Sequence, residues 1–179
     1  SAVDGVAVGR DYESLVLLSA YHELEATFAA ASDMLGWDPT RFFRDEQPIS
    51  VLVQPSFAHP ESEEEPRGNA FYFRCAHAFG LLAPSATEQL PLAVDRAVLA
   101  HEFGHLLFQQ TFGAAAGACD AAQAESNLQD PYFPGRLATE LAVSGLNEGF
   151  ADFVAFALFG VTSVLEESGF PTGRRSLVA

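Results

Sequence analysis

The sequence contains no lysine, and all nine of its basic residues are arginines. Aspartate and glutamate together number 24, so the formal net charge is −15 and the isoelectric point is about 4.5. Nucleic acids and anionic membranes attract proteins mainly through positive charge. The composition therefore excludes both as expected partners.

Cysteine is also scarce, with only Cys75 and Cys119 in the chain. Their separation does not match the paired-cysteine spacing of a zinc cluster, which excludes the zinc-finger class. The two residues allow one disulfide bond if the loop that contains Cys119 folds back onto the strand-like segment that contains Cys75. The alternative is two buried free thiols.

Long apolar segments are lacking as well. The longest candidate, residues 151–165, is shorter than the roughly 20 residues that cross a bilayer, and Asp152 interrupts it. We therefore predict no membrane insertion. The N-terminus shows no secretion signal. Because both ends of the chain are featureless, we expect residues 1–179 to form a single domain that is part of a longer protein.

Apolar and aromatic residues, by contrast, are abundant. Hydrophobic residues make up 49% of the chain and include 16 phenylalanines, which is typical of a globular domain with a substantial core. Residues 11–37 predict a long amphipathic helix that ends near Gly36. Its predicted apolar stripe consists of Leu17, Tyr21, Leu24, Phe28, Ala31 and Leu35.

Two segments have the composition of β-strands. Residues 49–54 alternate between apolar and polar side chains, and residues 69–79 predict a second strand rich in aromatic residues. The loop between them, residues 56–68, contains an acidic cluster. Because its carboxylates lack the regular spacing of a calcium loop, we interpret the cluster as solvated; calcium is possible there but not indicated.

Residues 97–108 are all apolar or glycine except His101, Glu102 and His105. We predict a buried helix that begins near Pro91 and runs to about residue 111. Positions four apart differ by about 40° around a helix axis, so both imidazoles lie on one face. They are placed to bind one Zn²⁺, with Glu102 beside them as general base. The alternative is two core histidines that share a face by chance.

A second apolar segment, 43 positions beyond His105, contains Glu148 and Asp152. We predict a short helix over residues 137–143 and then a separate helix that begins at Ser144 and runs to about residue 160. The two carboxylates, four positions apart, share a face of that helix. Glu148 can supply the third zinc ligand, and Asp152 can accept a hydrogen bond from a zinc-bound histidine.

Two other interpretations of these carboxylates remain open. Glu148 could be an exposed residue in a first helical turn, where the helix dipole favours negative charge. Asp120 or Asp130 could instead be the third zinc ligand, although neither lies in a helical pattern with a second carboxylate.

These residues resemble the motifs of gluzincins, specifically the thermolysin-like and fungalysin-like zinc metallopeptidases. The resemblance covers about residues 69–160 and rests on three motifs: His101-Glu102-x-x-His105, Asn147-Glu148-x-x-x-Asp152, and Asn69-Ala70-Phe71-Tyr72, which begins 32 residues before His101. It implies an α+β fold: a zincin-like lobe with a long N-terminal helix, a mixed sheet with a peptide-binding edge strand, and two helices that carry the zinc ligands. It also implies a secreted or periplasmic location.

The resemblance implies a metalloendopeptidase that acts on a peptide or protein substrate. Asn69 and Ala70 would bind the extended substrate along the edge strand. Glu102 would take a proton from water and pass it to the leaving amine. In the thermolysin-like enzymes a histidine from a C-terminal lobe stabilises the tetrahedral intermediate, and this chain has no histidine or tyrosine after Glu148.

The absence of this histidine leaves open which group would stabilise the oxyanion and whether the domain is catalytic. Either a C-terminal lobe is missing, or the protein is a reduced gluzincin, or the oxyanion donor comes from elsewhere in the chain, with Tyr132 and His77 as candidates. Tyr132, in the irregular crossover over residues 114–136, is equally well explained as a partly buried loop anchor. The alternative function is a non-catalytic, zinc-bearing domain that binds peptides or a partner protein and does not need Glu102.

Overall fold

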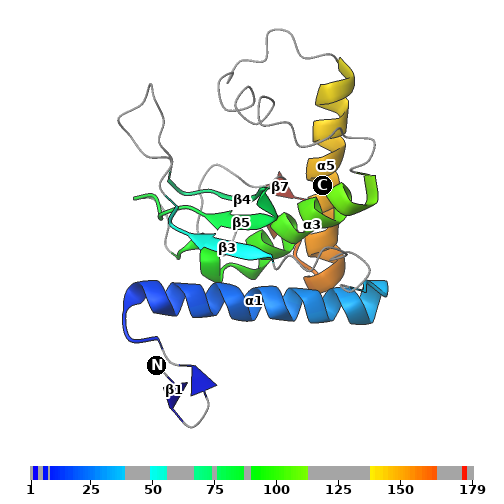
Figure 1. Cartoon of the computed structure of the whole chain (residues 1–179). Helices are drawn as coiled ribbons and strands as arrows, with labels where there is room; N and C mark the ends of the chain where they lie inside the picture. The colour runs from blue at the N-terminus through cyan, green and yellow to red at the C-terminus, as the bar shows by residue number, and fades with distance from the viewer. Residues whose placement is uncertain are drawn as a thin grey trace.

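The computed structural model describes residues 2–3, 6–7, 9–38, 49–55, 67–73, 76–86, 90–112, 138–164 and 175–176. Within these residues, three long helices surround a small sheet (Figure 1). Helix α1 lies along the bottom of the view, the sheet and helix α3 lie above it, and helix α5 stands upright near the C-terminal end of α1. Helix α3 packs against α1, α5 and the sheet, so it occupies the centre of the fold.

Helix α1 spans Tyr12–Leu35, which confirms the predicted first helix. Its start is fixed by a capping box, in which the Ser14 N–H donates to the Asp11 carboxylate (2.8 Å) and the Asp11 N–H donates to the Ser14 hydroxyl (3.2 Å). Its end is fixed by Gly36, whose φ of 63° is the left-handed conformation that terminates helices.

The predicted apolar stripe of α1 is partly wrong. Leu24 and Ala31 are buried as expected, but Leu17, Tyr21 and Leu35 are exposed. The buried face is formed largely by small side chains, which allow neighbouring helices to approach closely, whereas the predicted stripe was chosen for large apolar residues. The buried residues of α1 are Val16, Ala20, Leu24, Thr27 and Ala31.

The central sheet has the strand order β3-β5-β4, with bounds Ser50–Val53 for β3, Ala70–Phe73 for β4 and Ala78–Leu81 for β5. Strand β3 is parallel to β5, and β4 is antiparallel to β5, so the sheet is mixed. All four residues of β5 are buried, as expected for a central strand. Strand β4 lies at an edge of this sheet.

The single strand predicted over residues 69–79 is therefore wrong. The segment forms β4 and the beginning of β5, and the chain reverses between them near His77, whose φ of 48° is left-handed. Histidine is one of the few residues besides glycine that adopt this conformation with some frequency. Because no glycine, proline, asparagine or aspartate stands between Phe73 and Ala78, the sequence pattern did not reveal the reversal.

Helix α3 spans Arg96–Phe112 and contains the predicted motif. Pro91 was predicted to lie in the first turn of this helix. That prediction is wrong, because Pro91 precedes a 3-10 turn, η2, at Leu92–Val94. The buried Asp95 begins α3 instead: its Oδ1 accepts from the Ala97 N–H (2.9 Å) and the Val98 N–H (3.3 Å). These bonds satisfy N–H groups that have no partner within the helix.

Helix α5 is one continuous helix, Ala138–Phe159, so the predicted break and N-cap at Ser144 are wrong. Ser144 and Gly145 lie in a part of the helix, residues 142–146, that is exposed all round, and packing of the rest of the helix against α3 offsets their weak helix propensity. Glu148 consequently lies in the middle of a helix, which contradicts its interpretation as a first-turn carboxylate.

By length and composition alone, the segment Ala142–Phe159 could cross a membrane, and 28% of it is buried in the protein. Core helices of globular proteins share these properties. The sequence argument against membrane insertion considered only residues 151–165, which are fewer than the helix provides. The absence of membrane insertion therefore stays a prediction.

Two sets of contacts hold the helices together. The rings of Phe28, Trp37 and Phe103 form a cluster with centroids 5.0–5.4 Å apart, which joins α1 to α3. At the start of α3, Arg96 forms an ion pair with Glu23 of α1 and lies over the Phe159 ring at the end of α5.

The remaining strands form two small antiparallel pairs, which the sequence did not predict: β1 with β2, at Ala2–Val3 and Val6–Ala7, and β6 with β7, at Ser163–Val164 and Arg175–Ser176. Cys75, Cys119, Tyr132 and the acidic cluster between residues 61 and 65 lie outside the described residues.

Replacing the cap of the motif helix is expected to destabilise the fold. In Asp95→Ala the Ala97 and Val98 N–H groups lose their acceptor, so the free energy of unfolding should fall by about 0.5–2 kcal/mol. Asp95→Asn keeps an oxygen acceptor and should lose less. Urea denaturation of the three proteins measures both changes, and equal stability of Asp95→Ala and the wild type would contradict the capping role.

Candidate metal centre

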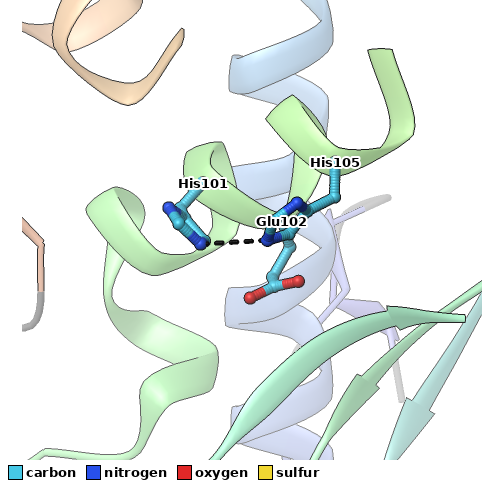
Figure 2. Close-up of side chains that lie close together, drawn as sticks. All are labelled: His101, Glu102 and His105. Carbon is cyan, nitrogen blue, oxygen red and sulfur yellow. Dashed lines mark hydrogen bonds between the residues drawn. The ribbon is translucent and has the colours of Figure 1, made fainter. Parts of the chain in front are cut away.

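His101 and His105 lie one turn apart on α3 and face each other (Figure 2). Their Nε2 atoms are 3.1 Å apart, and their rings are nearly perpendicular. His101 is buried and His105 half-buried. The apolar residues around the motif bury this part of α3, and the spacing of four positions then brings the two imidazoles together.

Helix α5 orients both rings from the other side. The Nδ1 atom of His101 lies 2.8 Å from Oδ1 of Asp152, and the Nδ1 atom of His105 lies 3.0 Å from Oδ1 of Asn147. An oxygen beside each Nδ1 favours the tautomer in which Nδ1 carries the proton. In a neutral imidazole, Nε2 then presents its lone pair, so both lone pairs are directed into the space between the rings.

Asp152 was predicted to hold a histidine in this way, whereas Asn147 was missed. Its position next to Glu148 was visible in the sequence. An asparagine within a helix has many possible roles, however, and only the rotation of α5 about its axis shows that its amide meets His105.

Glu148 reaches the same space from α5. Its Oε2 atom lies 3.6 Å from Nε2 of His101, and its Oε1 atom lies 3.6 Å from Nε2 of His105. The Glu148 side chain is 43% exposed, whereas that of His101 is buried. The structure therefore brings together the three residues predicted as zinc ligands.

The distances among these groups fit a tetrahedral zinc ion. Zinc binds histidine nitrogen and carboxylate oxygen at about 2.0–2.2 Å, so two ligand atoms of a tetrahedral site lie about 3.4 Å apart. Here the two Nε2 atoms are 3.1 Å apart, and each lies 3.6 Å from a different oxygen of the Glu148 carboxylate. Two imidazole nitrogens and one carboxylate are also the protein ligands of some catalytic zinc sites.

Glu102 lies beside this group on α3 and is itself buried (Figure 2). One of its oxygens and one nitrogen from each of His101 and His105 lie within 4.8 Å of one another. Glu102 therefore competes geometrically with Glu148 for the third ligand position. Glu148 fits better, because it contacts both Nε2 atoms, whereas consecutive residues on a helix, such as His101 and Glu102, do not face each other.

The charges of the site also favour a cation. Three carboxylates, those of Glu102, Glu148 and Asp152, surround two imidazoles, and two of the three are buried. Buried carboxylates are costly unless they are paired or bind a metal. Burial by itself lowers the pKa of His101, but the contacts with Asp152 and Glu148 and the charge of Glu102 outweigh it and raise that pKa to about 9.

The predicted substrate-binding residues lie at the start of the edge strand β4. The Asn69 carbonyl accepts from the Leu82 N–H on the β5 side (2.9 Å), so the next N–H, that of Ala70, points to the outer edge. There it donates to the side-chain oxygen of Asn69 (3.0 Å). The Ala70 N–H is therefore already bonded within the chain, and an incoming peptide would have to displace the Asn69 side chain to reach it.

Comparisons with protein-family models, with curated proteins and with solved structures gave no match to this chain. The resemblance to gluzincins thus rests on the motifs themselves, and the zincin-like fold stays a prediction. Tyr132 and the alternative ligands Asp120 and Asp130 lie outside the described residues.

The raised pKa of His101 predicts that the metal-stripped protein loses stability as the pH rises. The folded-state pKa of about 9 exceeds the ordinary value of 6.5, so the stabilisation is fully present below pH 6.5 and is lost as the pH rises through about 9. Denaturant unfolding with a chelator present, at pH 6 and at pH 9.5, measures this loss. His101→Gln cannot titrate there and should show a smaller decrease; an equal decrease in both proteins would contradict the assignment.

Proposed function

We propose that the protein is a zinc-dependent metallopeptidase whose ligands are His101, His105 and Glu148. The observation that carries this proposal is the convergence of two Nε2 atoms and one carboxylate at distances of 3.1–3.6 Å. The oxygens of Asp152 and Asn147 beside the Nδ1 atoms support it, because zinc-bound histidines in proteins almost always have such partners.

When bound, zinc supplies a Lewis acid that polarises the scissile carbonyl and lowers the pKa of water at the open position. Glu102 is the proposed general base, because its carboxylate lies beside both imidazoles without being the best-placed ligand. It takes the proton of the attacking water and transfers it to the leaving nitrogen. A C–O bond forms and the C–N bond breaks, so the products are a carboxylate and an amine.

The proposed substrate is a peptide or protein segment in extended form. Strand β4 packs against α3 and lies at the edge of the sheet, where an extended chain can add as a further strand. Asn69 and Ala70 are its proposed contacts, and Tyr132 is proposed as an oxyanion donor on the sequence argument alone. A secreted or periplasmic location accompanies this function as part of the proposal.

The two roles of the acidic residues are separable by mutation. Glu102→Gln removes the base but leaves both imidazoles and Glu148, so it should retain one zinc per chain. Its rate of peptide hydrolysis should fall by a factor of about 10²–10⁴. Elemental analysis measures the zinc, and mass spectrometry of a peptide mixture measures the cleavage.

His105→Ala is the matched control and should lose both zinc and hydrolysis. Undiminished cleavage by Glu102→Gln would contradict its role as base. A wild-type protein that binds zinc but cleaves no peptide would favour the alternative of a non-catalytic peptide-binding domain.

Removing the groups that orient the imidazoles should weaken zinc binding without abolishing it. Asp152→Asn replaces the negative partner of His101, and Asn147→Ala deletes the oxygen beside His105, so each should lower zinc affinity by about 10–100-fold. Competition with a chromophoric chelator measures the affinity. An unchanged affinity in either variant would remove that residue from the proposed site.

A further inference from the structure

The helices that supply the metal ligands touch at one point without any side chain between them. A Cβ atom added at Gly104 of α3 would lie 2.5 Å from Cα of Ala151 on α5 and 3.1 Å from its carbonyl oxygen. The first distance is far shorter than an ordinary van der Waals contact of about 3.5–4.0 Å. Both residues are buried, so a side chain added at Gly104 would have to push the two helices apart.

The site residues have the same spacing around this contact on both helices. His101 and His105 stand three positions before and one position after Gly104 on α3. Glu148 and Asp152 stand three positions before and one position after Ala151 on α5. On each helix, the residues three before and one after the contact differ by four positions and share a face. The four side chains therefore meet around the point where the backbones touch.

From this arrangement we infer that Gly104 is a positioning residue that acts through Glu148. The missing side chain allows α5 to approach α3 until the Glu148 carboxylate lies 3.6 Å from both Nε2 atoms. Metal–ligand distances tolerate only about ±0.2 Å. Displacement of α5 by even one ångström would remove Glu148 from the site but leave His101 and His105 together, because both belong to α3. This inference rests on the proposed zinc site.

The test is a double-mutant cycle between Gly104→Ala and Glu148→Ala, read as zinc affinity and as the visible spectrum of the Co²⁺-substituted protein. Gly104→Ala should lower zinc affinity by about 10–100-fold in the wild-type background, a loss comparable to that for other misplaced metal-site residues. In the Glu148→Ala background, it should cause a smaller further loss, limited to the effect of shifting Asp152 and Asn147 on the same helix. The Co²⁺ spectrum of Gly104→Ala should match that of Glu148→Ala.

The chain offers a matched control. Gly149 is also a helical glycine, next to Glu148, but a Cβ there would meet no neighbouring heavy atom within 4 Å. Gly149→Ala should therefore retain the wild-type affinity and Co²⁺ spectrum. If Gly104→Ala does not fold, Gly104→Ala/Ala151→Gly replaces it in the cycle. The second change removes the Ala151 Cβ, 3.1 Å away, while the contact with its Cα still displaces α5.

Equal losses of affinity in both backgrounds would overturn the inference, because they would show a general destabilisation rather than an effect through Glu148. An unchanged affinity and spectrum in folded Gly104→Ala would overturn it too, as would a wild-type protein that binds no zinc. Peptide hydrolysis is not part of the readout. A protein that binds zinc but cleaves nothing would contradict the proposed function and leave the role of Gly104 intact.

Discussion

The packing of α3 against α5 is the contact on which the candidate site depends. It brings three carboxylates together inside the protein. Glu102 comes from one helix, and Glu148 and Asp152 come from the other. In an isolated helix, these carboxylates could remain in contact with water, so they would carry no desolvation cost. Packed together, the helices enclose two of the three carboxylates beside two imidazoles, and such a group is stable only with a compensating positive charge.

The sequence predicted the parts of this arrangement that depend on spacing within one helix. His101 and His105 had to meet on any helix, and so did Glu148 and Asp152, because each pair is four positions apart in an apolar segment. That the two pairs face each other depends on how α5 is rotated about its axis and on how closely it approaches α3. For this reason Asn147 and Gly104, which show their roles only across the interface, were not recognised.

The errors in the fold have a similar origin. Ser144-Gly145 resembles a helix start, so the sequence placed the beginning of α5 wrongly. Asp95 stands six residues before the first histidine of the motif, so its role as the cap of α3 was not recognised. The predicted stripe of α1 included Leu17 and Tyr21 because large apolar side chains were assumed to be buried. In each case, the local sequence was compatible with more than one helix boundary or buried face, and the packing of the helices determined which of them formed.

The surroundings of the imidazoles are the argument for the proposed metal centre over a pair of core histidines. A core histidine pair needs only one hydrogen bond between the rings, with the outer nitrogens free to face any acceptor or water. Here oxygens of Asp152 and Asn147 lie beside both outer nitrogens, and both inner nitrogens face Glu148 as well as each other. Protonation of His101, whose pKa is about 9, would add one positive charge against three carboxylates. A divalent cation adds two, and it satisfies all three inner ligands at once, which a single proton cannot do.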